Sequence, residues 1–316
     1  MQIFSKEQLE KRLPFNILIE KLREAFCADY KVPLRHHHHF THPNSEKVNT
    51  LLLMPAFELG KYFGVKIVSV FPNNTAYNLP SIQGTYLLMN GKTGIPLASM
   101  DAKTLTTRRT AATSALASVY LSRKDSKTLL LIGTGALIPD LIEAHTTVRP
   151  IEQVFIWGRN LTKAQLIAKQ FSNAHFKINT IKTIEAGIAK ADIISCATLS
   201  EKPLVFGKYL QAGQHLDMVG SFKPNMREAD DEVILRSKIF VDQYEAATKE
   251  SGDIFIPLQT GILKRENIQA DLFELCKAEK TGRQSATEIT FFKSVGHALE
   301  DLAAAKMAFL FSRPKS

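Results

Sequence analysis

The sequence has few cysteines and no long hydrophobic segment. Its three cysteines, Cys27, Cys196 and Cys276, lie far apart and include no C-x-x-C pair, so neither a zinc site nor a dithiol redox motif is expected. Apolar runs such as Leu129–Ile132 have the length of a strand, well below the ~18 residues that span a membrane. Charged residues also interrupt the N-terminal stretch, which argues against a secretory signal. These absences predict a cytoplasmic protein without a membrane segment.

Clustered positive charge is absent as well. Lys and Arg outnumber Asp and Glu by 40 to 31, a formal charge of +9, but the basic residues are spread along the chain. No zinc-finger, basic-zipper or RNA-recognition signature is present, so we expect no nucleic-acid partner. A polyanion-binding protein stays an alternative, and it predicts binding that weakens steeply with salt. The 316 residues, 45% hydrophobic and 22% charged, are typical of a folded protein of about two domains.

The first third of the chain predicts an α/β segment with an antiparallel sheet. A helix is expected over residues 5–30, and the dipeptide Asn90-Gly91 is typical of a hairpin turn. Small, alanine-rich residues at 106–120 favour a helix that links two domains. The expected strands are 49–55, 64–71 and 84–90.

The middle of the chain alternates strand-length apolar runs with helix-length polar segments. Runs without strict alternation are typical of strands that are covered on both faces, as in a doubly wound parallel sheet. These runs lie at 128–133, 153–158, 176–181, 191–197, 215–220 and 238–243. A closing helix is expected over residues 286–311, returning to the first domain.

A glycine-rich turn follows the first of these runs. The residues are Gly133, Thr134, Gly135, Ala136 and Leu137, directly before a helix-like segment. The first glycine permits a tight turn, and the second lets the backbone approach a pyrophosphate at the helix N-terminus. The usual third small residue is replaced by isoleucine, and an ordinary strand-to-helix turn is the alternative interpretation. In this setting the turn predicts a nicotinamide dinucleotide site.

The end of the next run favours NADPH over NADH. A carboxylate there usually accepts hydrogen bonds from the ribose hydroxyls of NAD, whereas a 2′-phosphate needs cationic donors. The sequence offers Arg159, Asn160 and Lys163 and no acid. A solvated helix start capped by Asn160 is the alternative interpretation, and NADH stays possible.

Several ordered motifs carry a resemblance that spans nearly the whole chain. They are Gly64-Val65-Lys66, Phe71-Pro72-Asn73, Gly94-Ile95-Pro96-Leu97-Ala98, Met100-Asp101-Ala102, the run LTTRRTAA at 105–112, Val219-Gly220-Ser221, Arg227-Glu228, the run FKSVG at 292–296 and Asp301-Leu302-Ala303. With these motifs the chain resembles the ornithine cyclodeaminase/mu-crystallin family. The resemblance implies a Rossmann domain at 116–285 and a substrate and dimerisation domain built from 1–115 and 286–316. It also implies a homodimer.

The resemblance assigns roles to individual residues. Substrate binding falls to Arg35, Lys66, Ser81, Arg109 and Ser221, with Lys66 and Arg109 as the catalytic pair. A carboxylate taken out of water needs charge-assisted donors, which Arg and Lys supply. The alternative interpretation is a surface ion pair for each residue, or, for Lys66, a side chain whose ammonium extends to water.

Two further residues resemble positions that line the cofactor in relatives. They are Thr198, after the run at 191–197, and Val295 in the FKSVG stretch. In the alternative interpretation, both are ordinary packing residues.

One position departs from the cyclodeaminases that the chain resembles. They place an aspartate directly after the glycine of the fifth Rossmann strand, and this chain has Ser221. A neutral hydroxyl cannot bind an ammonium group as a carboxylate does. The resemblance therefore favours a reductase of cyclic ketimines that forms L-proline or L-pipecolate. A cyclodeaminase, an amino-acid dehydrogenase and a non-catalytic protein that binds NADPH and a small carboxylate are the alternatives.

Four consecutive histidines, His36 to His39, follow Arg35. Neighbours in an extended chain point to opposite faces, so at most two of them converge, and no carboxylate or cysteine stands nearby in sequence. We expect no metal site. His37 or His38 is predicted to form part of the wall of the substrate pocket.

Overall fold

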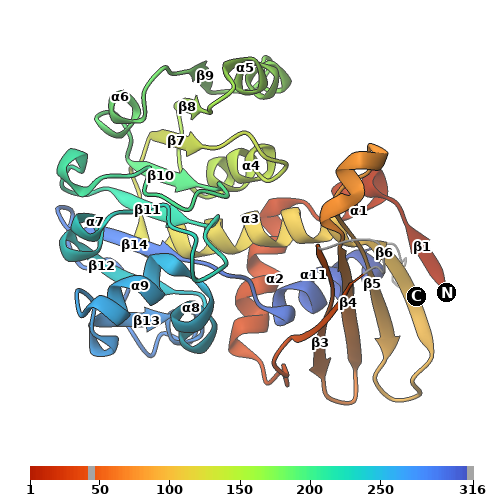
Figure 1. The fold of residues 1–316 in the computed structure, drawn as a ribbon. Coiled ribbons are helices and arrows are strands. Elements are labelled where there is room, and N and C mark those ends of the chain that lie inside the picture. Colours follow the sequence, from red (N-terminus) through yellow and green to blue (C-terminus); the bar gives the residue numbers. More distant parts are fainter. Residues whose placement is uncertain (42–46, 312–316) are drawn as a thin grey trace. The chain divides into compact units, whose positions relative to one another are not determined.

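The computed structural model describes residues 1–41 and 47–311, which form two compact units. The first unit contains residues 1–110 together with the chain from 297 onward, and the second contains residues 111–296 (Figure 1). No helix in the described residues is long and apolar enough to cross a membrane.

The first unit is built on a six-stranded sheet in the order β1-β6-β5-β4-β3-β2. All neighbours are antiparallel except β1 and β6, which are parallel, so the expected antiparallel sheet is confirmed. The turn after Asn90 joins β5 to β6 as a hairpin. The strands are β1 (Gln2–Phe4), β2 (His36–Thr41), β3 (Val48–Glu58), β4 (Tyr62–Val70), β5 (Ile82–Asn90) and β6 (Pro96–Asp101), and the 3-10 helix η1 (Pro72–Tyr77) precedes β5.

The helix expected over residues 5–30 is in fact two helices, α1 (Lys6–Arg12) and α2 (Phe15–Cys27). Pro14 is the N-cap of α2, and a proline has no N–H to continue the hydrogen bonding of a preceding helix. The buried face of α2 follows helical spacing and contacts α11 (Ala298–Leu310), which also contacts β3, β4 and β5. The core of the first unit therefore lies between these helices and one face of the sheet.

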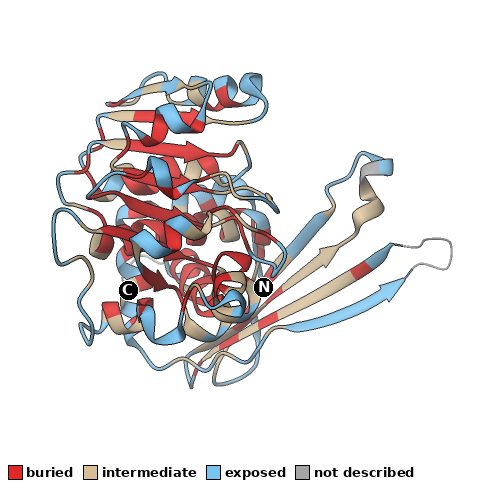
Figure 2. Cartoon of the chain, turned by 60° about the vertical axis from the view of Figure 1, so that its left-hand side comes forward, coloured by how far each residue is buried: buried red, intermediate tan, exposed pale blue. Residues whose placement is uncertain are grey.

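The second unit contains an eight-stranded sheet in the order β13-β12-β14-β11-β10-β7-β8-β9. Every neighbouring pair is parallel, which confirms the predicted Rossmann-type, doubly wound sheet. The strands other than β8 and β9 are largely buried, as Figure 2 shows in red. Their bounds are β7 (Thr128–Ile132), β8 (Gln153–Trp157), β9 (Lys177–Thr180), β10 (Ile193–Cys196), β11 (His215–Met218), β12 (Ser237–Val241), β13 (Ile268–Asp271) and β14 (Ile289–Lys293).

The prediction of a closing helix from residue 286 is wrong over its first part. Residues 289–293 form β14, which pairs with β11 on one side and β12 on the other, and α11 begins only at Ala298. The segment Ile289-Thr290-Phe291-Phe292 is β-branched and aromatic, and such residues suit a strand that is buried on both faces. The strand β13 was also not expected from the sequence.

The remaining helices connect these strands. The long helix α3 (Ala102–Leu121) begins in the first unit and continues into the second, and it contains the expected 106–120 segment. The others are α4 (Ile138–Val148), α5 (Leu161–Gln170), α6 (Ile184–Ile188), α7 (Asp231–Arg236), α8 (Tyr244–Glu250), α9 (Gly252–Thr260) and α10 (Leu272–Cys276), with the 3-10 helices η2 (Gly207–Tyr209) and η3 (Arg265–Asn267).

Candidate functional site

The glycine turn after β7 has the geometry that the sequence predicts. Gly133 has φ +131°, a conformation that other residues rarely adopt, and an added Cβ would lie 2.7 Å from the carbonyl oxygen of Ala197. A Cβ at Gly135 would meet nothing within 4 Å, so that side of the turn is open. α4 follows, with Pro139 in its first turn. The turn and the helix N-terminus thus present backbone N–H groups suited to a phosphate.

A pocket of about 470 Å³ lies at the carboxyl ends of β7, β8 and β10. This edge of a parallel sheet is where nucleotides bind in doubly wound folds. Its lining includes most of the cofactor residues that the sequence predicts, but not Ala136, Leu137 or Val295. The lining residues are Gly133, Thr134, Gly135, Trp157, Gly158, Arg159, Asn160, Lys163, Ala197, Thr198, Leu199, Ser200 and Leu204. The residues present therefore fit a nicotinamide dinucleotide.

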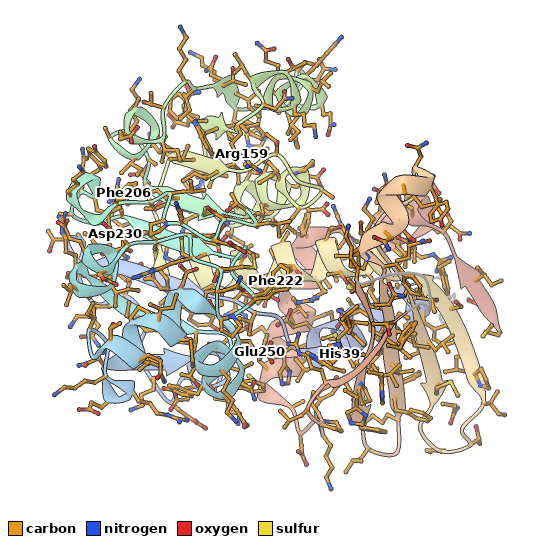
Figure 3. All side chains as sticks on the ribbon, viewed as in Figure 1. His39, Arg159, Phe206, Phe222, Asp230 and Glu250 are labelled. Carbon is orange, nitrogen blue, oxygen red and sulfur yellow. The ribbon has the colours of Figure 1, made fainter. Side chains whose placement is uncertain are left out.

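The segment after β8 caps the next helix and also lines the pocket. Oδ1 of Asn160 accepts a hydrogen bond from the backbone N of Lys163 at 3.0 Å, so Asn160 caps α5. Arg159, labelled in Figure 3, is exposed directly after β8. It also lines the pocket. None of the described residues that line this pocket is Asp or Glu. The cationic lining suits a phosphate group better than a pair of ribose hydroxyls.

Sequence reasoning missed the role of Glu228, a buried carboxylate that joins the loops after β10 and β11. Its Oε1 accepts hydrogen bonds from the backbone N and the hydroxyl of Thr198, each at 2.7 Å. Its Oε2 accepts from the backbone N of Gly220 at 2.7 Å and of Ser221 at 3.2 Å. Burial raises the pKa of Glu228, against the opposing charge of Lys293. Glu228 therefore fixes the pocket residue Thr198 relative to the next loop.

The hydroxyl of Ser221 is engaged within its own surroundings. It is buried, donates a hydrogen bond to the carbonyl of Met226 at 2.6 Å and lies 3.1 Å from the hydroxyl of Ser251. Val295, which is also a predicted cofactor residue, donates its backbone N–H to Oδ2 of Asp242 at 2.7 Å. Both residues are therefore held by internal hydrogen bonds of the second unit.

In the first unit, Lys66 and Arg109 lie together among buried charges. Only 3% of Lys66 and 5% of Arg109 is exposed. Lys66 Nζ lies 2.7 Å from Oδ2 of Asp301, and Arg109 Nε lies 3.1 Å from Oδ1 of the same residue. Arg109 Nη1 lies 2.6 Å from Oε2 of Glu300. We call these four residues the buried charge cluster.

The charges in the cluster shift one another's ionisation. Burial lowers the pKa of Lys66 to about 8, and the field of Asp301 opposes this change. Burial alone would raise the pKa of Asp301, but Lys66 and Arg109 outweigh it and hold that pKa below its ordinary value. The sequence names Asp301 among the family motifs without a role. Its signal is a pair of adjacent acids in a largely apolar helix.

Arg35 and Ser81 have different positions in the first unit. Arg35 directly precedes β2, and together with burial and Arg109 it lowers the pKa of His297 to about 4. Ser81 directly precedes β5, and its carbonyl accepts a hydrogen bond from the backbone N of Phe71. It lies five residues before Tyr86, the residue of β5 that pairs with Lys66. At the rise of a strand this is about 16 Å, so Ser81 does not join the cluster.

The histidine tract forms most of β2, an exposed edge strand. Its rings alternate between the two faces as expected. His36 and His38 have ring centroids 6.4 Å apart, and His37 and His39 have theirs 6.2 Å apart. No group of three or more metal-ligating side chains occurs in the described parts of the chain. A role of His37 or His38 beside the substrate stays a prediction.

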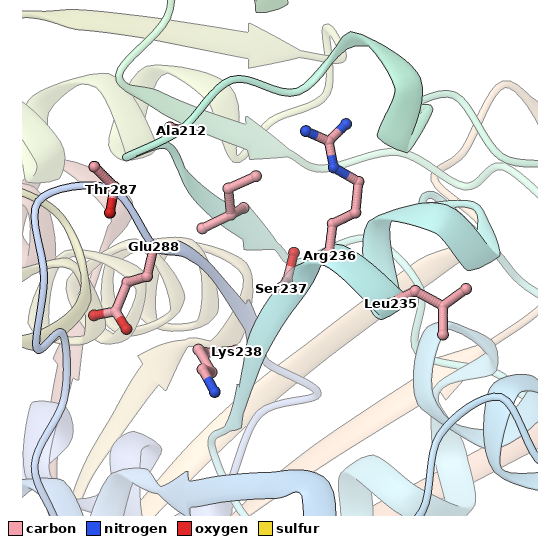
Figure 4. A pocket seen from close by; sticks show the side chains of 8 residues that line it. Ala212, Leu235, Arg236, Ser237, Lys238, Thr287 and Glu288 are labelled. Carbon is pink, nitrogen blue, oxygen red and sulfur yellow. The ribbon is translucent and has the colours of Figure 1, made fainter.

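A second hollow of the second unit, of about 410 Å³, lies at the amino ends of β12 and β14 (Figure 4). Among its lining residues are Arg236, Lys238 and Glu288. The guanidinium of Arg236 already donates hydrogen bonds to the carbonyls of Gly207 and Leu210. This hollow is at the opposite edge of the sheet from the glycine turn, and we assign it no role.

Comparison with known proteins places the chain in a family. The model of the ornithine cyclodeaminase/mu-crystallin family matches residues 3–310. The chain belongs to this family. A Δ1-pyrroline-2-carboxylate reductase of Colwellia psychrerythraea is 39% identical over 309 residues, which cover 96% of this chain and 97% of that protein. The resemblance seen in the sequence is thus confirmed.

Solved structures agree with this placement. The Thermococcus litoralis Δ1-pyrroline-2-carboxylate reductase, in complex with NADH and L-proline, has a TM-score of 0.91 and 36% identity, and covers 99% of this chain and 97% of its own. An archaeal alanine dehydrogenase dimer with bound NAD has a TM-score of 0.90 and 29% identity, with 99% and 96% covered. The prediction that the chain is an oxidoreductase is confirmed by these relatives.

Proposed function

We propose that this chain is an NADPH-dependent reductase of cyclic ketimines, which converts Δ1-pyrroline-2-carboxylate to L-proline and Δ1-piperideine-2-carboxylate to L-pipecolate. The observation that carries the proposal is Ser221. Its neutral hydroxyl is held by Met226 and Ser251 where cyclodeaminases are expected to have a carboxylate. The similarity to two Δ1-pyrroline-2-carboxylate reductases supports the same substrate class.

The buried charge cluster supplies the expected contacts for the substrate carboxylate. The ammonium of Lys66 and the guanidinium of Arg109 are fixed by internal ion pairs, so they lose little freedom when a carboxylate binds. Arg35 is the third predicted contact. With the carboxylate held, the orientation of the ring carbon that accepts hydride is set by these side chains, and positioning of this kind can account for much of the rate.

The cofactor would be held by the glycine turn and the residues after β8. Backbone N–H groups near Gly133 and Gly135 would bind the pyrophosphate, and Arg159 with Lys163 would contact the 2′-phosphate. When bound, the nicotinamide supplies the hydride that adds to the C=N carbon. The preference for NADPH is argued from the cationic, carboxylate-free lining, and NADH stays the alternative. A homodimer and a cytoplasmic location stay predictions.

The direct test follows the absorbance of NADPH, and separately of NADH, with purified protein and each of the two imines. Ornithine with NAD is the control for cyclodeamination. We expect rapid oxidation of NADPH with at least one imine and no ammonia from ornithine. Ammonia from ornithine without imine reduction would show that the absence of a carboxylate at Ser221 does not exclude cyclodeamination. No turnover with any substrate would favour a binding protein.

A further inference from the structure

One carboxylate contacts both cations of the predicted substrate clamp. Oδ2 of Asp301 lies 2.7 Å from Lys66 Nζ, and Oδ1 lies 3.1 Å from Arg109 Nε. Lys66 comes from the middle of β4, Arg109 from α3 and Asp301 from the first turn of α11. Asp301 therefore joins three elements of the first unit at the point where the substrate carboxylate is expected.

We infer that Asp301 is a positioning residue, which fixes Lys66 against Arg109 and keeps the lysine in its charged form for binding of the substrate carboxylate. The inference rests on the proposed function. It gives Asp301 a role through the two cations and no contact with the reacting atoms.

The geometry explains why an aspartate suits this position. Its carboxylate presents a separate oxygen to each cation, and its short side chain has few rotamers to lose. None of Asp301 is exposed, so water does not compete for either contact. An acid in the first turn of α11 is also favoured by the helix dipole. Extension by one methylene, as in glutamate, would displace at least one of the two contacts.

The groups around Lys66 decide its charge. Asp301 and Glu300 on α11 favour the ammonium, while Arg109 on α3 opposes it. From the neighbouring strand β5, Tyr86 stands opposite Lys66, and burial together with the charge of Asp301 raises the pKa of its phenol. Burial of Lys66 is the largest effect and favours the neutral amine, with a resulting pKa of about 8. Without the charge of Asp301, burial and Arg109 both act against protonation.

Glu300 offers a matched comparison. It is as buried as Asp301 and adjacent in sequence, and it contacts Arg109. Glu300 has the smallest effect of these groups on the pKa of Lys66, whereas Asp301 has the largest effect of any charged group. Removal of the charge at 300 therefore disturbs the cluster without removing the main support for the ammonium of Lys66.

The experiment compares wild type, D301N and E300Q in kcat/KM for Δ1-piperideine-2-carboxylate between about pH 6 and about pH 9. The imine itself titrates equally in all assays, so the ratio of variant to wild type isolates the enzyme group. At the alkaline end of the range, we expect kcat/KM of D301N relative to wild type to fall about tenfold for each unit by which the pKa of Lys66 drops. At the acid end this relative kcat/KM should recover. The KM for NADPH should stay near wild type. In E300Q we expect a ratio that is lowered but nearly constant with pH.

A D301N ratio that is the same at all pH values, or an equal pH dependence in both variants, would overturn the inference. If D301N does not fold, as judged by thermal unfolding, D301E takes its place, since it keeps the charge and displaces the contacts. D301E should lose about tenfold or more in kcat/KM, while kcat/KM should decline at the same alkaline pH as in wild type. Wild-type kinetics in D301E would contradict the positioning role.

Failure of the proposed function is distinguishable from failure of this inference. If wild type reduces neither imine but oxidises or deaminates an amino acid, the proposed function is wrong, and the same pH series is run on that amino acid. Its carboxylate would need the same cations. A constant D301N ratio in that series would then reject the inference on its own.

Discussion

The ammonium of Lys66 lies 2.7 Å from the carboxylate of Asp301, and both side chains are almost completely buried. A buried lysine in the middle of a strand is costly to desolvate, and the adjacent carboxylate offsets part of that cost. We propose that Lys66 binds the carboxylate of a cyclic imino acid, together with Arg109.

Replacement of Lys66 or Arg109 by methionine should greatly weaken binding of the transition state. Each substitution removes a charged donor from a buried site and leaves Asp301 without one of its partners. We expect kcat/KM for the imine to fall by the equivalent of about 2–4 kcal/mol, with little change in the KM for NADPH. The control is K61M, because Lys61 is exposed and its partner Glu58 keeps a second ion pair with Lys306, so this variant should stay near wild type. Near-wild-type kinetics in K66M would refute the clamp.

Replacement of Arg159 by alanine should affect the two cofactors unequally. If Arg159 contacts the 2′-phosphate, R159A should raise the KM for NADPH about tenfold or more and that for NADH only slightly. Steady-state assays with both cofactors measure this ratio. K169A is the matched control, because Lys169 is an exposed cation of α5, the helix that follows Arg159, but does not line the pocket. Equal changes for both cofactors in R159A would contradict the assignment.

Replacement of Ser221 by alanine should destabilise the second unit. The buried hydroxyl donates to Met226 and contacts Ser251, so its loss leaves a buried carbonyl with one partner fewer. We expect the free energy of unfolding to fall by about 1–2 kcal/mol. S172A, at an exposed serine, should change it by less than about 0.5 kcal/mol. Unchanged stability with a raised KM for the imine would instead place the hydroxyl on the substrate.

The protein should lose stability in weak acid. Burial lowers the pKa of His215 from its ordinary 6.5 to about 3, so the unfolded chain binds a proton that the folded chain excludes between these values. Stability present above about pH 6.5 is therefore lost as the pH falls toward 3. Urea unfolding at about pH 7 and about pH 4.5 measures the loss, which should be smaller in H215Q. An identical loss in both proteins would exclude His215 as a source.

The sequence predicts the Rossmann-type sheet well because its signals are local. Apolar runs such as Leu129–Ile132 and the glycines at 133 and 135 lie within one strand-turn-helix unit, where spacing decides the structure. The helix expected from residue 286 fails for the opposite reason. The segment 289–293 becomes a strand because β11 and β12 enclose it, a tertiary effect that helical propensity cannot show.

In the candidate site, too, the sequence predicts what depends on local motifs and misses contacts between distant residues. The family motifs predict Lys66 and Arg109 as clamp residues. Their pairing with Asp301 has no local pattern, because Asp301 lies 192 positions from Arg109 and still farther from Lys66. Glu228 is similar, since its hydrogen bonds reach the loops after two different strands. Buried carboxylates that organise other site residues are therefore the part that the sequence does not show.

The central claim is tested most directly by the fate of the hydride. Δ1-Piperideine-2-carboxylate is reduced with NADPH that carries deuterium at the transferable position, and the product is examined by mass spectrometry and proton NMR. The proposed function predicts L-pipecolate with one deuterium at C2. Pipecolate without deuterium at C2, or no reduction of either imine by an enzyme that is folded and binds NADPH, would contradict it.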